Sequence, residues 1–491
     1  MGGPVPPRAV PRERTSRGCP LSPHPDRSRL ATVTIPAPDL RPEAFLRHAE
    51  GEERGFWARG DRWVAHRGVV AELRGGDRSV DRFEEVASAA REFARDPFVP
   101  EGTARSPRLR YYGGFSFRPD HVAEGVWSDF PAWLFHVPVF ELEGEGSGDA
   151  WLRVRALVDV GAGQDVFVRL RHRAEALRAE LTSAGEGSMR PRAAVRGRGA
   201  ATDRARWEDT VRKSLDAIER GVISKAVLAR TLDVELEEPV DPVDVVAHLW
   251  KVNRGSYVFL FEPTPGATLV GAAPETVATL RDGVFHATAV AGSIRRGETT
   301  REQAELAARL LASEKDRNEQ RIALDDMVAR LGTVAHQIRT DPQPHVLTLD
   351  RIQHLETEIR ASVPSEVGIL DLLRLLHPTP AVCGLPRDSA MAFLSAEEPF
   401  ERGWYAGPVG LFDAEGNGIF VPALRMGVST GSGWRLFAGA GIVDGSVPAS
   451  EWEETAIKFE PMLEALAASG AEVAHAGDAG VGRAGPPRAG A

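Results

Sequence analysis

The sequence predicts an α+β protein built on large antiparallel sheets, and three features of the chain indicate that class. Runs rich in β-branched and aromatic residues follow one another across short turns that contain Gly and Pro, as in sequential hairpins. Amphipathic helical segments are mixed with these runs, but the regular strand–helix alternation of a doubly wound fold is missing. No GxGxxG or Walker-A motif is present, so a nucleotide-binding α/β fold is not indicated.

Three polar segments divide the chain. Residues 1–30 are rich in Pro and Arg, lack the apolar stretch of a secretory signal and are predicted to be disordered. We expect the same of the Ala/Gly tail at 469–491. A third segment, 183–200, is predicted to be a loop between a first part, 31–182, and a second part, 201–468.

The first part is predicted to contain four strands and two helices. The strand-like runs, which are bounded by Gly and Pro, lie at 62–68, 108–117, 132–144 and 151–160. Helical periodicity marks 80–96 and 165–184. This part contains no cluster of chemically suggestive residues, and we expect it to supply half of a core.

The second part mixes strands and helices in a similar way. A helix over 203–220 ends at Gly221, because glycine readily takes the left-handed conformation that closes a helix. A hairpin over 276–290 turns at Asp282 and Gly283. The other predicted strands are 222–230, 256–263, 267–273, 407–428 and 434–443, and the other helices are 242–252, two over 301–338, 365–376 and a last one from Glu451.

The composition is that of a soluble globular protein, with 42% hydrophobic residues and a net charge of −10 over 491 residues. The negative balance argues against a nucleic-acid partner, because phosphate contacts need clustered Lys and Arg. No apolar run reaches the length of about 18 residues that would predict a membrane span. Only two cysteines are present, Cys19 and Cys383, which excludes a Cys-based zinc site and favours a reducing, cytoplasmic location.

Two helices of the second part begin with acidic side chains spaced i, i+3. In SEKDRNEQ (313–320), Ser313 and Asp316 fit a capping box, which gives Asp316 a structural explanation. Glu319 lies on the same helix face and has no such explanation. A solvated acidic first turn that complements the helix dipole is the alternative.

The last helix repeats this pattern in SEWEETAIK (450–458). Ser450 and Glu453 fit a second capping box. The residues that remain along one face are Glu451, Glu454 and Lys458. Because Mg²⁺ binds few carboxylates and keeps several waters, Glu319 and Glu454, one from each helix, would suffice. Spacing alone does not decide between this metal site and two solvated helix starts.

Lys225 lies in VISKAVLAR, a strand whose faces are otherwise apolar. A desolvated lysine loses its proton more easily and can act as a general base, whereas an edge-strand lysine that blocks aggregation is the alternative. Glu275 follows an apolar strand and a proline in VGAAPET. It is a candidate general acid with a raised pKa, or a turn carboxylate.

Further residues are candidates for binding a substrate. Backbone N–H groups in Gly-rich turns can bind a carboxylate, although such turns are also common as bulges. Arg425 could pair bidentately with a carboxylate, His354 is a lone histidine for which packing is the plainer explanation, and Thr379 lies in a Pro-rich loop. The Gly-rich turns hold Ala291, Gly292 and Ser293, and Gly439, Ala440 and Gly441.

Eight blocks occur in a characteristic order across 201–468. They are SKAVLAR, GAAPET, AGSIRRG, EKDRNEQ, LHPTPAVCGLP, ERGWYAGPVG, FAGAGIV and EWEETAIK. Together they resemble the chorismate-utilising enzymes, and most closely the isochorismate synthases. The first part is similar only in YYGGFSF and PAWLFHVPVF. The resemblance implies one chorismate-utilising domain over 31–468, with two large antiparallel sheets packed as a core and helices outside.

The resemblance also implies roles for the candidate residues. Lys225 would be the general base that activates water, and Glu275 the general acid at the departing hydroxyl. Glu319 and Glu454 would bind Mg²⁺, with Asp316 and Glu451 as nearby acids. Carboxylate binding would fall to Tyr405, Arg425, Lys458, Gly439, Ala440 and Gly441, and the rest of the pocket to Ala291, Gly292, Ser293, His354 and Thr379.

The implied activity is the reversible, Mg²⁺-dependent conversion of chorismate to isochorismate for menaquinone or siderophore biosynthesis. Water would attack ring C2 while the C4 hydroxyl leaves, which requires a base and an acid. Within the family, a salicylate synthase that goes on to eliminate pyruvate and an aminodeoxychorismate synthase component are alternatives. A non-catalytic chorismate-binding protein is the alternative from another class. We expect a monomer or weak homodimer without a fused glutaminase, a nucleic-acid partner or a membrane partner.

Overall fold

The computed structural model describes residues 28–75, 81–102, 108–146, 148–184, 195–199, 202–349 and 351–469. The disorder predicted for both ends lies outside these residues except at the inner margins, where 28–30 begin the first strand instead. No helix in the described part of the chain is long and apolar enough to cross a lipid bilayer.

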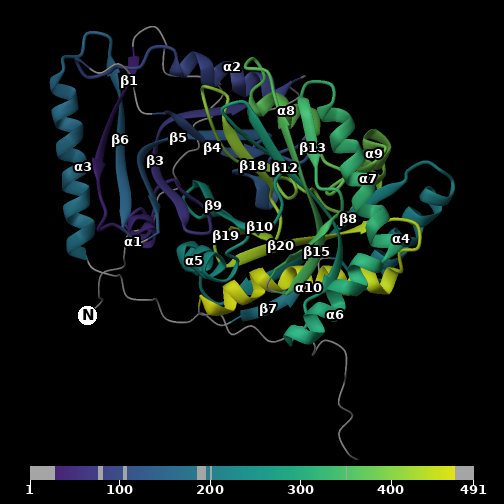
Figure 1. Cartoon of the computed structure of the whole chain (residues 1–491). Coiled ribbons are helices and arrows are strands. Elements are labelled where there is room, and N and C mark those ends of the chain that lie inside the picture. Colours follow the sequence, from purple (N-terminus) through teal and green to yellow (C-terminus); the bar gives the residue numbers. More distant parts are fainter. Residues whose placement is uncertain are drawn as a thin grey trace, which may run out of the picture.

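The strands form one antiparallel network that divides into two sheets (Figure 1). The two-residue strand β16 (Gly384–Leu385) pairs with the beginning of β8 in the first sheet. The other strands of the first sheet are, in spatial order, β7 (Val195–Gly199), β8 (Lys225–Leu236), β20 (Gly433–Ile442), β19 (Met426–Thr430), β10 (Ala267–Ala273), β9 (Tyr257–Thr264), β2 (Arg54–Arg59), β3 (Arg62–Gly75), β5 (Trp133–Glu145), β6 (Asp149–Asp159) and β1 (Ser28–Pro36).

The second sheet begins at β5, whose first residues pair with β4 while its last residues pair with β6. From β5 it runs through β4 (Arg110–Phe115), β17 (Pro408–Asp413), β18 (Gly418–Pro422), β11 (Ala278–Arg281), β12 (Val284–Arg295) and β15 (Ile352–Ser362) to β13 (His336–Thr340) and β14 (His345–Thr348). Because β2 pairs with β9 and β4 with β17, strands from 31–182 and 201–468 are combined in both sheets.

The two sheets pack face to face, and the alternation of side chains along each strand divides the core into layers. In β9, Phe259 and Phe261 face the second sheet, whereas Val258 and Leu260 face the outer helices. The helices outside the first sheet are α1 (Pro42–Arg47), α3 (Asp165–Ala184), α5 (Pro242–Val252) and α10 (Pro448–Ala468). Outside the second sheet lie α2 (Arg82–Ala94), α7 (Glu314–Leu331) and α8 (Ile369–Leu376).

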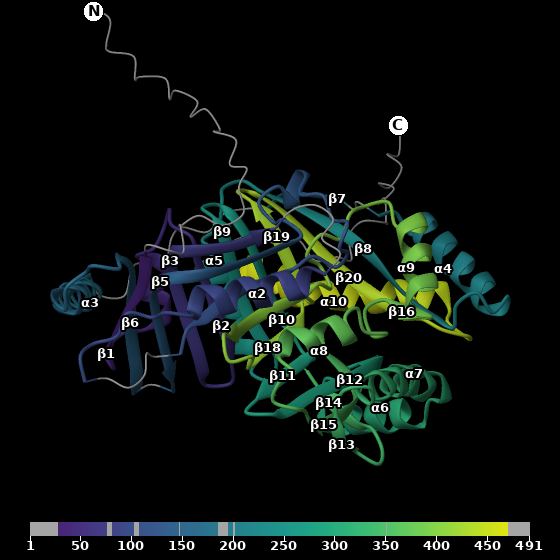
Figure 2. The ribbon, with the colours of Figure 1, turned by 90° about the horizontal axis from the view of Figure 1, so that it is seen from above.

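Three further helices complete the outer layer. Side chains of α4 (Arg204–Glu219) and α9 (Arg387–Glu397) pack into the end of the inner core near β8. Figure 2 shows α6 (Thr300–Ala312) and α7 together beside β12 and β15. A 3₁₀ turn, η1 (Gly125–Trp127), lies between β4 and β5. The predicted α+β class, with two antiparallel sheets and external helices, is confirmed.

Several local predictions match the structure. The predicted helices 165–184 and 242–252 coincide with α3 and α5, and the predicted strand 267–273 coincides with β10. The hairpin of β11 and β12 turns at Asp282 and Gly283, whose φ angles of 50° and 80° are those that a two-residue primed turn requires.

Other local predictions were wrong. Residues 195–199, placed in a loop, form β7 against β8. The second helix predicted over 301–338 ends at Leu331, after which β13 begins. The last helix starts at Pro448 instead of Glu451, because proline at the first helical position presets the helical φ. The predicted cap of Ser450 and Glu453 is therefore wrong, and Val447 is the N-cap residue.

Candidate active site

A cavity with about 670 Å³ of empty space, its mouth included, lies between the two sheets near α7 and α10. Strands β8, β12, β15 and β20 and the two helices contribute side chains to its wall. The predicted site residues that line it are Glu275, Ala291, Gly292, Ser293, Glu319, His354, Tyr405, Arg425, Gly439, Gly441, Glu454 and Lys458.

The remaining predicted residues do not line this cavity. Lys225 is fully buried directly behind Glu319. Ala440 alternates to the opposite face of β20 from Gly439 and Gly441. The hydroxyl of Thr379 is buried and has no hydrogen-bond partner among the described residues. Asp316 and Glu451 lie one helical turn before Glu319 and Glu454 on their respective helices.

Lys225 and Glu319 form the innermost polar contact. The Nζ atom lies 3.0 Å from Oε1 of Glu319, but its direction does not suit a hydrogen bond, and Nζ has no hydrogen-bond partner in the described part of the chain. The other oxygen, Oε2, accepts a 3.2 Å hydrogen bond from the backbone N–H of Gly292. Burial raises the pKa of Glu319, but Lys225, with smaller contributions from the charges of Lys315 and Lys458, outweighs it and lowers the pKa.

Glu275 lies in the cavity wall directly after β10 and is 7% exposed. Burial raises its pKa to about 7, while the positive charges of Lys225, Arg425 and Lys458 act in the opposite direction. The side chain therefore exchanges its proton near neutral pH, which a turn carboxylate in water would not do. The geometry thus supports the interpretation of Glu275 as a buried acid with a raised pKa, and not as a turn carboxylate.

His354 and Arg425 are coupled by a hydrogen bond that determines the state of the histidine. Nε2 of His354 lies 2.9 Å from Nη2 of Arg425, and because a guanidinium can only donate, Nε2 must be the acceptor. The proton is then on Nδ1, which lies 2.9 Å from the Ser293 hydroxyl and 3.2 Å from the carbonyl oxygen of Gly292. Burial and the Arg425 charge lower the pKa of His354 well below its usual value, in agreement with a neutral ring.

Arg425 has an unusual backbone conformation and, among the described residues, no carboxylate partner. Its φ of 48° lies in the left-handed region, which is uncommon for a residue with a long side chain and is typical of functional sites. Burial lowers the pKa of its guanidinium to about 10, and no acidic side chain of the described residues forms an ion pair with it. A buried guanidinium that lacks a counter-ion and faces a cavity is suited to bind an anionic ligand.

Acidic residues gather at the N-terminal ends of α7 and α10. Lys458 Nζ donates to Glu454 at 2.6 Å and to the Gly439 carbonyl at 2.8 Å, and Lys315 lies 2.7 Å from Glu451. Burial, reinforced by neighbouring carboxylates, raises the pKa values of both Asp316 and Glu451. Four acids, Asp316, Glu319, Glu451 and Glu454, thus share three lysines, which leaves a surplus negative charge.

This acidic group has hard oxygen donors, which suit Mg²⁺. In the part of the chain that the structure describes, no three His, Cys, Asp or Glu side chains are grouped to hold an ion by themselves. Mg²⁺ commonly takes one or two protein carboxylates and completes its shell with water and substrate oxygens. The two carboxylates of Glu319 and Glu454, which line the same cavity, fit this coordination preference. At the start of α7, Ser313 caps the backbone N–H of Asp316, but the N–H of Ser313 donates to the Leu310 carbonyl, so only half of the predicted capping box forms.

Glycine is required at two positions beside these acids. A Cβ atom on Gly441 would lie 2.0 Å from Oε1 of Glu319 and 3.2 Å from Cε of Lys225. A Cβ atom on Gly439 would lie 2.8 Å from the Tyr405 hydroxyl. The glycines of FAGAGIV therefore make room for the polar side chains that reach the cavity.

The sequence did not indicate the apolar part of the wall. These residues are Val227, Pro274, Val290, Ala381, Val382, Ala406, Leu424, Phe437 and Ala438. Apolar side chains in strands have the same local pattern whether they face a core or a cavity. Among them, only Val227 carried a usable signal, because it shares a strand face with Lys225.

The chain resembles known proteins over most of its length. The profile of a family described as chorismate binding enzyme matches residues 19–467. The salicylate biosynthesis isochorismate synthase of Pseudomonas aeruginosa is 35% identical over 405 residues, which cover 82% of each protein. Isochorismate synthase MenF of Bacillus subtilis is 31% identical over 443 residues, which cover 87% of this chain and 91% of that protein.

Solved structures share the fold. MenF, the menaquinone-specific isochorismate synthase from Escherichia coli, superposes with a TM-score of 0.73 at 25% identity and covers 90% of this chain and 95% of its own. Anthranilate synthase component I from Streptococcus pneumoniae superposes with a TM-score of 0.63 over 92% of this chain and 95% of its own. At 18% identity, the latter likeness concerns the fold alone.

Proposed function

This chain belongs to the chorismate binding enzyme family, and from that premise we propose that it is an isochorismate synthase that interconverts chorismate and isochorismate with Mg²⁺. One observation carries the proposal: a carboxyl group with a pKa of about 7 and an arginine without an ion pair among the described residues line one cavity, and a buried lysine lies directly behind its wall. Relatives with that name over most of their length support it.

In the proposed reaction, Lys225 takes a proton from a water that attacks ring C2, and Glu275 gives a proton to the hydroxyl that leaves C4. One proton is taken up and one is released, so the overall charge is unchanged. Lys225 must be neutral to act as a base, and its Nζ atom lies 3.0 Å from Oε1 of Glu319.

The substrate is a dicarboxylate, and the cavity offers several groups that bind carboxylates. Arg425 is held in place by His354, Lys458 lies beside the carbonyl of Gly439, and the Tyr405 hydroxyl lies close to the same glycine. We assign carboxylate binding to these groups, together with the backbone of Gly439 and Gly441. His354 and Ser293 complete the wall near the ring.

Glu319 and Glu454 are the residues that would hold Mg²⁺, with Asp316 and Glu451 acting through water. Bound there, the ion would neutralise a substrate carboxylate and stabilise developing negative charge. Its charge would also balance the surplus of acidic side chains at the ends of α7 and α10.

The test is to incubate the purified protein with chorismate and Mg²⁺, with and without EDTA, and to identify the products. We expect isochorismate alone, formed to an equilibrium mixture, and no turnover with EDTA. Salicylate with pyruvate would instead identify a salicylate synthase, and an aminated product in the presence of ammonia would identify an aminodeoxychorismate synthase component. A protein that binds chorismate without any product would be a non-catalytic binder, and the proposal would be wrong.

We further propose that the enzyme works in the cytoplasm as a monomer or weak homodimer and supplies menaquinone or siderophore biosynthesis. Relatives named for both pathways occur, the menaquinone-specific enzyme of Escherichia coli and the vibriobactin-specific enzyme of Vibrio cholerae. Light scattering during size-exclusion chromatography would measure the molar mass and detect a stable larger assembly.

A further inference from the structure

Strand β8 carries Lys225, and one of its edges is paired with other strands along only part of its length. On that edge β16 pairs with β8 at Lys225 and Ala226, and β7 pairs with it only from Asp233 onward. No strand of the described residues pairs with this edge between those points. The opposite edge is fully paired with β20, where Val227 faces Gly441 and Ala229 faces Gly439.

Three side chains take the place of the missing strand. One is Thr202, whose hydroxyl accepts a 3.3 Å hydrogen bond from the N–H of Thr231. The other two are Arg402 and Glu398. Nη2 of Arg402 donates a 2.6 Å hydrogen bond to the carbonyl of Val227, and Oε1 of Glu398 accepts a 2.8 Å hydrogen bond from the N–H of Ala229. Arg402 and Glu398 are themselves joined by hydrogen bonds of 2.5 and 2.7 Å, and their side chains are 3% and 6% exposed. Without them, buried backbone groups of β8 would lack partners.

Arg402 also ties β8 to a second cavity wall. Its Nη1 atom donates a 2.9 Å hydrogen bond to the carbonyl of Val382, and both Val227 and Val382 line the cavity. The guanidinium stacks on Phe117, with 4.5 Å between Cζ and the ring centroid. One charged group thus holds together the strand of the proposed base and the loop that follows α8.

We propose that the Arg402–Glu398 pair is a positioning device that sets the place of Lys225 by completing the open edge of β8. The inference rests on the proposed function, because it assigns the pair an effect on the step in which Lys225 acts. Val227 lies two residues beyond Lys225 on the same strand face, so a displaced β8 moves the amine relative to the cavity.

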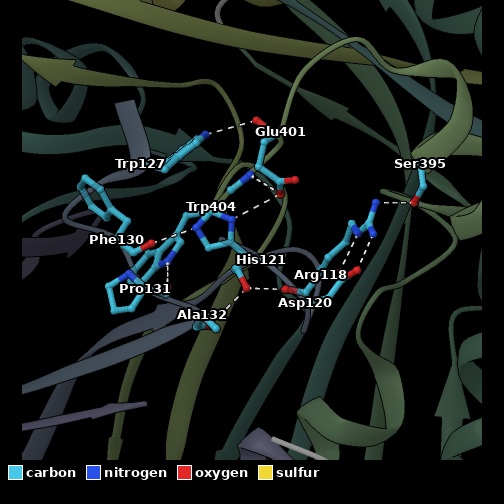
Figure 3. Close-up of polar contacts among 12 residues, drawn as sticks. Arg118, Asp120, His121, Trp127, Phe130, Pro131, Ala132, Ser395, Glu401 and Trp404 are labelled. Atoms are coloured by element: carbon cyan, nitrogen blue, oxygen red, sulfur yellow. Dashed lines mark hydrogen bonds and ion pairs between the residues drawn. The ribbon is translucent and has the colours of Figure 1, made fainter. Parts of the chain in front are cut away.

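The effect is expected on turnover and not on substrate affinity. Arg425 and Lys458, two of the proposed carboxylate ligands, lie on other elements that Arg402 does not touch. Tyr405 does contact Arg402, whose Cζ lies 5.7 Å from its ring centroid, but Figure 3 shows the segment before Tyr405 also anchored to residues 121–131. There His121 bonds Glu401 at 3.3 Å, and the indole N–H of Trp404 donates to the Pro131 carbonyl at 2.7 Å.

Arg54 and Glu262 supply a matched control. They form a 2.6 Å hydrogen bond, are 4% and 5% exposed, and lie on β2 and β9 outside the cavity lining. Like the first pair, Arg54 donates to a backbone carbonyl, that of Leu46, and Glu262 accepts from a backbone N–H, that of Gly266. Substitutions of Arg54 thus reproduce the loss of a buried pair without reaching β8.

The experiment compares Arg402→Met and Arg402→Lys with Arg54→Met and Arg54→Lys, measuring kcat and KM for chorismate and the melting temperature of each variant. For Arg402→Met we expect kcat to fall about 100-fold while KM stays within about threefold, because misplacement of a catalytic group by about 1 Å has an effect of that size. Arg402→Lys should restore part of kcat. Both Arg54 variants should melt earlier and keep the kcat of the wild type.

The other possible results also decide for or against the positioning role of Arg402. A wild-type kcat in Arg402→Met, or a rise in KM without a fall in kcat, would overturn the positioning role. If Arg402→Met does not fold, an unchanged kcat in Arg402→Lys does the same, and a reduced kcat at unchanged KM supports the role. An equal loss of kcat in the Arg54 variants would show a general structural effect and overturn it. Wild-type protein without turnover would overturn the proposed function itself and this role with it.

Discussion

At the scale of single residues, burial is the main cause of the state of Glu275. Desolvation raises its pKa to about 7, and the cations around the cavity only partly oppose this change. A carboxyl group with this pKa carries a proton in half of the molecules at neutral pH. That is the condition under which a general acid is most effective near the working pH.

The raised pKa predicts how activity depends on pH. As a general acid, Glu275 must be protonated, so kcat/KM should be constant below about pH 7 and fall above it. The fall should approach roughly tenfold per pH unit, as for a single ionisation. Initial rates of chorismate turnover between pH 5.5 and 9 measure this profile, and a flat profile up to pH 9 would contradict the acid role.

The same shift predicts the pH dependence of stability. The pKa of Glu275 is about 7 in the folded state and 4.5 in the unfolded state. Its protonated form therefore stabilises the fold fully below pH 4.5, and this contribution is lost as the pH rises to about 7. Above pH 7 the buried carboxylate destabilises the fold by on the order of 3 kcal/mol. Glu275→Gln should therefore be inactive but melt later than wild type at pH 8 and not at pH 4.5, by calorimetry.

Lys225 is the second residue on which turnover should depend. We expect Lys225→Ala to lower kcat by about 10³-fold or more, because a general base contributes effects of about 10² to 10⁴. Chorismate should still bind, since the proposed carboxylate ligands are unchanged. Titration calorimetry measures binding, and Lys213→Ala, which removes an exposed lysine on α4, is the control. Wild-type kcat in Lys225→Ala would remove the base assignment.

At the scale of elements, β20 shows why a strand beside an active site needs glycine. A side chain at Gly441 would occupy the place of the Glu319 carboxylate and press against Lys225. The strand can approach α7 closely only because every second residue there has no side chain. The close approach brings the Lys225–Glu319 contact to the cavity wall.

This packing makes Gly441→Ala a sharp test of the contact between β20 and α7. The new methyl group must displace Glu319, and we expect kcat to fall about 100-fold, the effect of a displacement of about 1 Å. Gly161→Ala is the matched control, because a Cβ atom there meets no other atom within 4 Å. Equal activity of both variants, in the chorismate assay, would show that the position of Glu319 does not matter.

At the scale of the whole molecule, the acidic group exists because the fold brings the starts of two distant helices together. Lys315 of α7 contacts Glu451 of α10, although 136 residues separate them. Lys225 reaches the same place from β8. The proposed Mg²⁺ would relieve the surplus of negative charge at this junction, so its binding should stabilise the fold.

We expect Mg²⁺ to raise the melting temperature of the wild-type protein and EDTA to reverse the rise. At a hundredfold excess over Kd, linkage alone gives about 2.7 kcal/mol. Glu454→Gln should abolish the rise. Glu453→Gln changes the neighbouring residue on α10, which is largely exposed, and should leave it unchanged. A Glu454→Gln variant that still responds fully would exclude this carboxylate as a ligand.

Local sequence patterns predicted much of the fold. The hairpin at Asp282 and Gly283, the end of α4 at Gly221 and the helix α5 follow from turn and capping chemistry, which acts over a few residues. The patterns missed two helices, α1 and α9, and the strands β1, β2, β7, β13, β14, β15 and β16. They also predicted the start of α10 three residues late, because Ser450 and Glu453 have the spacing of a capping box although Pro448 is the first helical residue.

The sequence by itself determined the chemical inventory of this protein: a lysine in an apolar strand, a carboxylate after another, and two helices that begin with acids. Only the tertiary structure decided that Lys225 faces Glu319, that His354 holds Arg425, and that Arg402 and Glu398 complete the edge of β8. The physical reason is that burial, electrostatic coupling and sheet pairing depend on groups far apart in the chain. Local propensity carries no information about those partners.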